Sequence, residues 1–187
     1  MKIKLQNICH ISTGVYVKTE RIGDVYYIQA RDFDKYLNLE LGLKPEIYSG
    51  NINNNHYLKS GDIIIAAKGF HHFAFTFKEQ VMPAVASSMF IVLRQIDRNK
   101  AIPDFITWYI NHPKTQTHLS RVSKGSSLPS INKSIIGELE ISIPSLEKQE
   151  LILTISKLRV EESRLKECIE DLKDDLINEK LINILKY

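Results

Sequence analysis

An apolar side chain recurs every seven residues through the last quarter of the chain, and a second apolar row follows the first at a spacing of four. The first row is Leu151, Leu158, Leu165 and Leu172, and the second is Ile155, Ile169 and Leu176. This spacing places both rows along one side of an α-helix, which is the pattern of a coiled-coil seam. A helix over 145–187 would be roughly 65 Å long at about 1.5 Å per residue, which is more than the core of a small domain needs. We therefore predict that the helix pairs with a second helix.

The start of this helix is marked by its own sequence signals. Pro144 stops the preceding pattern, Ser145 can cap the first free amides, and Glu147 and Glu150 lie in the first turns, where the helix dipole favours acidic residues. Glu162 interrupts the seam once, and after residue 176 the apolar positions move to another face. An alternative is a single helix that lies over its own domain.

The composition describes a soluble globular protein. Of the 187 residues, 43% are apolar and 25% are charged, and a domain over 1–144 is large enough to bury a core without disulfides or a metal. Cys9 and Cys168 have neither metal-ligand nor redox spacing, so we expect two free thiols in a reducing compartment. The first seven residues have no signal-peptide core, and the longest apolar run, 81–93, is too short to span a bilayer. We expect a cytoplasmic protein.

Charge is divided unevenly along the chain. Residues 1–143 contain 17 Lys and Arg against 12 Asp and Glu, whereas residues 144–187 contain 8 against 10. The globular part is therefore basic and the helix is mildly acidic. This balance permits a polyanionic partner but does not require one.

The first half of the chain has the pattern of β-strands and the second half that of helices. Strands are predicted at 26–30, 63–67, 73–77, 88–93 and 139–143, with a short amphipathic piece at 5–11. Pro103 begins a helix that ends near His112, a second helix runs to Arg121, and 132–137 forms a helical turn. The expected fold is α+β, with a β-rich domain over 1–144 followed by the long helix over 145–187.

Motifs for catalysis are few. The sequence has no glycine-rich phosphate loop, no target-base motif of an adenine methyltransferase and no His-Cys zinc pattern. Asp62 and Lys68 flank an apolar strand as in some nucleases, but without an acid two positions before the lysine we interpret them as a strand-entry turn. The adjacent His71 and His72 lack a third metal ligand at useful spacing, so they are expected to form a polar loop.

Several stretches together resemble a known family, the DNA specificity subunits of type I restriction-modification systems. The residues that carry the resemblance are Tyr27 to Asp32, Leu58 to Gly69, Pro103 to Phe105, Gly125-Ser126, Ile131-Asn132, Ile136, Leu139, Ile141 to Pro144, Leu146, Gln149 and Ile152. The run 125–152 is similar to the junction between a target-recognition domain and the helix of these subunits. The resemblance spans essentially the whole chain.

Two departures from the family pattern stand out. Pro144-Ser145-Leu146 and Lys148-Gln149 stand where the family often has Pro-Pro-Leu and Glu-Gln. Family members also usually carry two recognition domains and two helices, whereas this sequence contains one of each. The resemblance thus implies a half-subunit form, in which two copies pair their helices antiparallel and read an interrupted palindrome.

The resemblance also implies partners and cofactors. Double-stranded DNA is the expected ligand, and a DNA adenine methyltransferase is the expected partner, together with a restriction subunit where the system has one. This chain itself would then be non-catalytic and bind no cofactor or metal. S-adenosylmethionine would be bound by the methyltransferase, and ATP with Mg²⁺ by the restriction subunit.

Candidate DNA contacts are loop residues of two kinds. Phosphate contacts need cations or exposed donors, and the candidates are Lys18, Arg21, Lys68, Lys78, Lys124, Ser126 and Ser127. Base contacts in the major groove need amides, guanidinium or imidazole groups, and the candidates are Arg31, Asn53, Asn54, Asn55, His71 and His72. Each has an ordinary alternative, because loop lysines are usually only solvated and asparagine runs often only form turns. The loop Lys68 to His72 is the favoured candidate, and the seven apolar seam residues are the predicted dimer interface.

Two other functions compete with DNA recognition. The chain could be a non-catalytic interaction or inhibitor protein that binds the methyltransferase or another specificity subunit without reading DNA. A stand-alone nuclease or modifying enzyme is disfavoured by the missing motifs. Salt-dependent DNA binding separates the first two functions, because specific readout adds affinity beyond the phosphate contribution.

Overall fold

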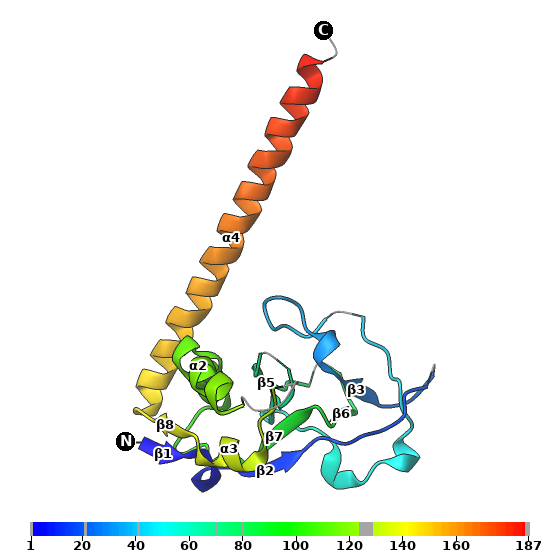
Figure 1. Ribbon diagram of the computed structural model, residues 1–187, viewed down its shortest axis with the longest axis vertical. Coiled ribbons are helices and arrows are strands. Elements are labelled where there is room, and N and C mark those ends of the chain that lie inside the picture. The colour runs from blue at the N-terminus through cyan, green and yellow to red at the C-terminus, as the bar shows by residue number, and fades with distance from the viewer. Residues whose placement is uncertain are drawn as a thin grey trace. The chain divides into compact units, whose positions relative to one another are not determined.

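The computed structural model describes residues 2–20, 22–40, 42–69, 71–79, 81–123 and 129–185. The chain divides into two compact units, Met1–Gln149 and Glu150–Tyr187. The first unit contains the strands and the short helices, and the second consists of the long helix beyond its first turn (Figure 1). Within the described residues this order confirms the predicted α+β class.

The elements of regular structure follow one another in the order that Figure 1 labels. The strands are β1 (Lys2–Lys4), β2 (His10–Thr13), β3 (Tyr26–Ile28), β4 (Ile63–Ala66), β5 (Ala74–Thr76), β6 (Ala84–Ala86), β7 (Phe90–Arg94) and β8 (Glu140–Ser142). The α-helices are α1 (Pro103–Asn111), α2 (Pro113–Val122), α3 (Lys133–Glu138) and α4 (Leu146–Ile184). Short 3-10 turns cover Leu5–Asn7, Ala30–Asp32, Ser49–Asn51 and Asn54–His56.

The main sheet has the strand order β2-β7-β4-β5 and is antiparallel throughout. Its register places His10 opposite Arg94 and Ile63 opposite both Leu93 and Thr76. A second pair, β3 and β6, is parallel, and β1 pairs antiparallel with β8. The β1–β8 pair therefore ties the N-terminal residues to the segment that precedes α4.

Strand β4 lies at the centre of the core because both of its faces are covered. Ile63 and Ile65 pack in a cluster with residues of α1, α2, α3 and β8. Ile64 and Ala66, which point to the opposite face of the strand, pack with residues of β3 and β6. Burial on both faces explains the uninterrupted apolar run of β4 in the sequence.

The observed strands differ in detail from the predicted ones. The strand predicted at 26–30 ends at Ile28, because the Asp32 carboxylate accepts a hydrogen bond from the Gln29 amide at 2.7 Å and the chain turns there. The amphipathic piece predicted at 5–11 is instead a 3-10 turn over Leu5–Asn7 followed by the start of β2. Strands β1, β2 and β6 were not recognised from the sequence, because each contains a single branched apolar residue (Ile3, Ile11 or Val85) and so sets up no clear pattern.

A buried glutamine anchors the first turn of α4 within the first unit. The helix begins at Leu146, and the side chain of Gln149 is completely buried. Its Oε1 accepts a hydrogen bond from the Ile102 amide at 2.9 Å, and its Nε2 donates to the carbonyl oxygens of Lys100 and Pro144, each at 2.9 Å. Both amide hydrogens and one of the two lone pairs of the amide oxygen are thus used.

The second unit is a continuous helix whose predicted seam is exposed. The seven apolar seam side chains are between 50 and 62% exposed. Glu162, the polar interruption, forms ion pairs on its own helix with Arg159 at 2.8 Å and with Lys166 at 2.6 Å. The helix therefore presents a long apolar stripe with one charged cluster near its middle.

Candidate nucleic-acid interface

The loop between β4 and β5 lies beside the segment that begins at Pro129. Lys68 forms an isolated antiparallel bridge with Ser130, and the Gly69 amide donates to the carbonyl oxygen of Pro129 at 3.0 Å. Pro129 directly follows the loop 124–128, so the loop that contains Lys68 lies beside the segment leading out of the predicted phosphate-binding loop. Gly69 has a φ of +112°, a conformation that other residues rarely adopt. Lys68 and His71 are both exposed at this end of the sheet.

His72 does not fit the prediction that it contacts bases, because it is completely buried. Its Nδ1 lies 3.0 Å from the Ala66 carbonyl oxygen, and its own carbonyl accepts a hydrogen bond from Gln116 Nε2 at 3.0 Å. The pairing of β5 with β4 continues to Phe73, whose carbonyl oxygen accepts a hydrogen bond from the Ala66 amide at 2.8 Å, and side chains alternate between the two sides along such a pairing. His71 is exposed for this reason, whereas the His72 side chain points into the domain.

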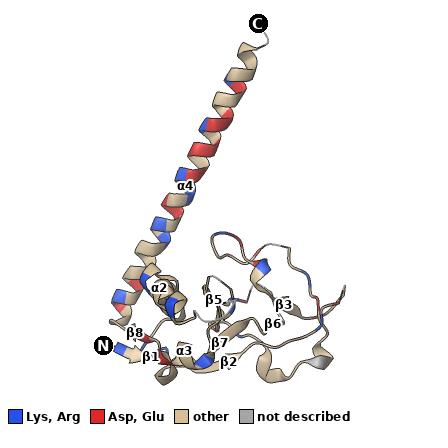
Figure 2. Ribbon diagram, viewed as in Figure 1, with Lys and Arg blue, Asp and Glu red and all other residues tan. Residues whose placement is uncertain are grey.

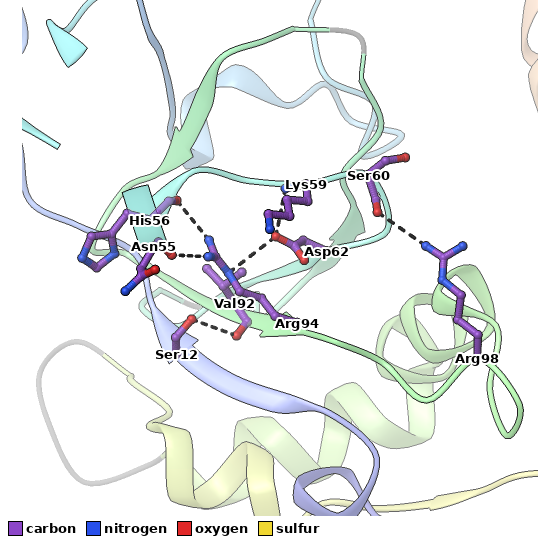
Figure 3. Close-up of polar contacts among 9 residues, drawn as sticks. All are labelled: Ser12, Asn55, His56, Lys59, Ser60, Asp62, Val92, Arg94 and Arg98. Atoms are coloured by element: carbon purple, nitrogen blue, oxygen red, sulfur yellow. Dashed lines mark hydrogen bonds and ion pairs between the residues drawn. The ribbon is translucent and has the colours of Figure 1, made fainter. Parts of the chain in front are cut away.

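A polar hollow of about 560 Å³ lies at the opposite end of β4 (Figure 3). One side is formed by the residues that enter β4. The other side is formed by the first residues of β2, which pair with the end of β7, and by the residues that follow β7 toward α1. Its lining residues are His10, Ser12, Asn55, His56, Lys59, Ser60, Gly61, Asp62, Arg94, Gln95, Ile96 and Arg98. The antiparallel register creates the hollow, because it places the start of β4 beside the end of β7.

Arg94 holds the turn that carries the asparagines. Its guanidinium donates to the carbonyl oxygens of Asn55 and His56, the latter at 3.0 Å, and its Nε lies 3.5 Å from Asp62 Oδ2 (Figure 3). The same carboxylate oxygen accepts a hydrogen bond from the Lys59 amide at 3.0 Å. Arg94 is therefore engaged with the protein itself and fixes the turn Asn54–His56 to the sheet.

The buried carboxylate of Asp62 has a perturbed affinity for protons. Burial raises its pKa, and this effect is opposed by the Lys59 amide hydrogen bond and by the positive charges of Arg94 and Lys59. The side chains of Asp62 and Arg94 are only 8% and 16% exposed. The pair is thus a largely buried ion pair that needs both members, because either charge alone would be costly in this position.

Two further cations lie at the rim of the hollow. Lys59 is exposed, and Arg98 donates to the Ser60 carbonyl oxygen at 3.5 Å. Gly61 has a φ of +90°, and a Cβ at this position would lie 2.5 Å from Arg98 Nη2. Glycine therefore allows both the turn and the close approach of the arginine. This arrangement leaves positive charge available for an anionic ligand such as a phosphate.

The remaining predicted contact residues are distributed over several places. Lys18 is exposed and lines an open groove with Lys44. Arg31 pairs with Glu46 at 3.1 Å, and Lys78 lies 3.9 Å from Asp104. These ion pairs leave both side chains more than half exposed, at 63% and 60%.

The asparagine run forms a defined turn rather than an irregular loop. Asn53 Oδ1 accepts a hydrogen bond from the Asn55 amide at 3.0 Å, and Asn53, Asn54 and Asn55 are all exposed. Arg21, Lys124, Ser126 and Ser127 lie outside the described residues.

The structure therefore groups the candidates into separate regions instead of one surface. Lys68 and His71 lie at one end of β4, whereas Asn55 lies at the other end, in the hollow. Lys59, Arg94 and Arg98, which line the hollow, were not among the candidates. Only the pairing of β4 with β7 brings them together, so a local sequence signal could not have identified the hollow.

Neither a metal-binding cluster nor a membrane-spanning helix is found in the described part of the chain. No group of three or more His, Cys, Asp or Glu side chains in it could hold a metal ion. None of its helices is both long and apolar enough to cross a membrane.

The described residues thus form a β-rich domain with basic loops, followed by a helix with an exposed apolar seam. The family model described as "Type I restriction modification DNA specificity domain" matches residues 1–170. The chain therefore belongs to this family.

Solved structures share the fold of this chain. The S subunit of a type I restriction-modification system from M. genitalium has a TM-score of 0.59 at 13% identity, over 89% of this chain and 40% of that chain. The HsdS subunit from Thermoanaerobacter tengcongensis has a TM-score of 0.63 at 20% identity, over 88% of this chain and 43% of that chain. A chain from a structural study of complex assembly and conformational transition of the type I R-M system gives 0.61 at 20% identity, with the same two coverages.

This chain spans about two fifths of the length of those structural relatives. Comparison with curated protein sequences finds no match.

Proposed function

We propose that this chain is a DNA sequence-recognition module of a type I restriction-modification system. The family match over residues 1–170 is the observation that carries this proposal. The module reads its target through loops at the ends of the main sheet, and it supplies specificity to partner enzymes without a catalytic step of its own.

The charge and exposure of the loops support DNA as the ligand. Lys68 and His71 are exposed in the loop after β4, and Lys59 and Arg98 lie at the rim of the hollow. Cations in such positions suit phosphate oxygens, and imidazole and amide groups suit base edges in the major groove. Arg94 contributes by keeping the asparagine turn in a fixed position.

The helix is proposed to pair with the helix of a second copy in antiparallel orientation. Its charge is polarised, since Lys157 to Lys166 contains four basic and two acidic residues and Glu167 to Glu179 contains one basic and six acidic residues (Figure 2). In an antiparallel pair the acidic stretch of each helix lies beside the N-terminal half of the other helix, which carries Lys148, Lys157 and Arg159 against one acid, Glu150, whereas a parallel pair opposes two acidic stretches. The opposed helix dipoles favour the same orientation. Two recognition modules related by this two-fold axis would read an interrupted palindrome.

In this proposal the chemistry belongs to partner subunits. A DNA adenine methyltransferase binds S-adenosylmethionine and modifies the target that the dimer selects. A restriction subunit, where the system has one, uses ATP and Mg²⁺ for cleavage.

DNA binding in the presence of the methyltransferase tests the proposal. A methylation screen with the complex identifies the target, and fluorescence anisotropy then measures the affinity for target and non-target duplexes between 50 and 200 mM salt. We expect tighter binding to the target and a linear fall of log K with log salt, because phosphate contacts release counterions. Equal affinity for all duplexes, or no binding, would instead favour the interaction or inhibitor function.

A matched pair of lysine variants tests the loop after β4. Lys68→Gln should reduce the magnitude of the salt slope by about 0.9, the value for one lost phosphate contact on B-DNA. Lys2→Gln, an exposed lysine on β1 outside the main sheet, should leave the slope unchanged. An unchanged slope for Lys68→Gln would remove this loop from the interface while leaving the rest of the proposal intact.

A further inference from the structure

The seam of α4 consists of two rows of side chains that alternate along the helix. One row is Leu151, Leu158, Leu165 and Leu172, and the other is Ile155, Glu162, Ile169 and Leu176. The exposed fractions of the apolar members are at least 50%. An apolar stripe of this length is typical of a surface that is covered by a partner.

Two-fold symmetry limits how two such seams can meet. In an antiparallel pair of identical helices, each side chain of one row faces a side chain of the other row, and the axis lies midway between the facing residues. Only registers that differ by whole heptads keep the rows facing each other. One of them brings all four positions of each row into contact.

In that register every position of the seam has a facing partner. They are Leu151 with Leu176, Ile155 with Leu172, Leu158 with Ile169, and Glu162 with Leu165 of the second copy. The polar interruption then falls next to the symmetry axis, so the apolar pairs on both sides of it remain continuous. A shift of one heptad in either direction leaves apolar residues at the seam ends without a facing partner.

The positions just beyond the seam favour the same register. Continuing the two rows along α4 by one heptad step reaches Lys148 at one end and Glu179 at the other. In the matched register these two residues face each other across the pair with opposite charges. A shift of one heptad would instead place Glu179 against Ile155 or Lys148 against Leu172, which buries a charge against an apolar side chain.

The charges near the axis are also compatible with this arrangement. Glu162 already bonds Arg159 and Lys166 of its own helix, at 2.8 and 2.6 Å. Both cations flank the seam, so each carboxylate enters the pair with its charge compensated. Glu162 faces a leucine of the other row in each of these registers, so it costs some stability in all of them and the choice of register rests on the seam ends.

We infer that two copies of this chain pair through α4 in a single antiparallel register, with Leu158 facing Ile169 of the partner and the two-fold axis between Ser163 and Arg164. This inference rests on the proposed dimerisation and adds the register to it. The register has a functional consequence, because a slip of one heptad moves one helix by about 10 Å along the other. That distance corresponds to roughly three base pairs of DNA, so the register sets the spacer between the two half-sites.

Disulfide cross-linking of cysteine variants tests the register. The starting protein carries Cys168→Ser, which removes the exposed thiol of α4. Leu158→Cys combined with Ile169→Cys should give a covalent dimer on a non-reducing gel, because facing core positions meet the distance that a disulfide requires. Ser156→Cys combined with Asp171→Cys is the control. In the proposed register position 156 also lies level with position 171 of the partner, but both positions are on the outer side of the helix pair, so no cross-link should form.

Two further pairs report slipped registers, and a single variant reports parallel pairing. Leu158→Cys with Leu176→Cys, and Leu151→Cys with Ile169→Cys, each cross-link only after a shift of one heptad. Leu158→Cys alone cross-links only when the helices are parallel. A dominant covalent dimer from any of these three would overturn the inferred register.

Light scattering of the starting protein separates failure of the register from failure of dimerisation. A dimer with the wrong cross-links refutes the register alone, whereas a monomer at all concentrations refutes both the register and the proposed homodimer. The substituted seam side chains are exposed in the chain, so the thermal melting of the recognition domain should not change. An altered melting curve would show that the variant acts through folding. The experiment would then be repeated with the neighbouring pair Ile155→Cys and Leu172→Cys. This pair must cross-link if the register is correct.

Discussion

The buried amide of Gln149 should be one of the most sensitive positions of the chain. Gln149→Leu fills the same space but leaves the Ile102 amide and the carbonyl oxygens of Lys100 and Pro144 without their partner. A buried polar group without a hydrogen bond costs about 1–3 kcal/mol, and losses at one site are not additive, so we expect a total loss of about 3–5 kcal/mol. This is a large fraction of the roughly 5–15 kcal/mol that stabilises a typical domain.

The charge variant at the same position sharpens the test. Gln149→Glu keeps an acceptor for the Ile102 amide but points a carboxylate at two carbonyl oxygens, so the folded state should hold the acid with a pKa above its unfolded value. Its stability relative to the native protein should therefore be greatest at pH values below the unfolded pKa, and should fall as pH rises through the folded pKa. Gln149→Leu has no titrating group and should show no such trend.

Urea denaturation measures both effects. Trp108, the single tryptophan, lies on α1 and stacks on Phe105 with ring centroids 5.6 Å apart, so its fluorescence reports unfolding of this region. The protein concentration is held constant because association shifts apparent stability. Glu150→Leu, an exposed neighbour of Gln149, is the control and should change stability by less than about 1 kcal/mol. A loss of under about 1 kcal/mol for Gln149→Leu would refute the role assigned to the hydrogen bonds.

Three further predictions concern the helix, the hollow and the thiols. Leu165→Glu should convert the dimer to a monomer in light scattering, because it buries an uncompensated charge in the seam; an intact dimer would contradict the paired seam. Arg94→Met should lower the free energy of unfolding by about 3–5 kcal/mol, because it leaves Asp62 buried and unpaired. Adding Asp62→Leu to the same chain should restore much of this loss. If urea denaturation shows no recovery, the broken ion pair is not the cause of the loss. In the native protein a thiol reagent at pH 8 should modify the exposed Cys168 but not Cys9, because burial raises the pKa of Cys9 to about 12. Modification of both thiols before unfolding would disprove this difference.

Local patterns in the sequence were sufficient for the main elements. The heptad spacing predicted α4, which the structure shows as one helix from Leu146 to Ile184. Pro103 at a helix start and the apolar run at Ile63 correctly predicted α1 and β4. These signals succeed because helix periodicity, proline geometry and a fully buried strand are each encoded within a few consecutive residues.

The accessibility of the candidate contacts was harder to predict. His71 and His72 are neighbours of the same type, yet one is exposed and the other completely buried. Which of the two points inward depends on the register of β5 in the sheet, and that register is set by pairing with β4. The proposed DNA contact at position 72 failed for this reason.

By itself the sequence determined the α+β class, the exposed heptad seam and the family to which the chain is similar, since all three depend on residue types at short, regular spacings. The tertiary structure alone decided which polar groups are available to a ligand. Asp62 and Arg94 become a buried pair, and Gln149 becomes an anchor for Ile102, only because the fold brings distant segments within hydrogen-bonding distance. The free energy of burying a polar group depends on those partners, and a partner supplied by another strand or helix leaves no signal in the local sequence.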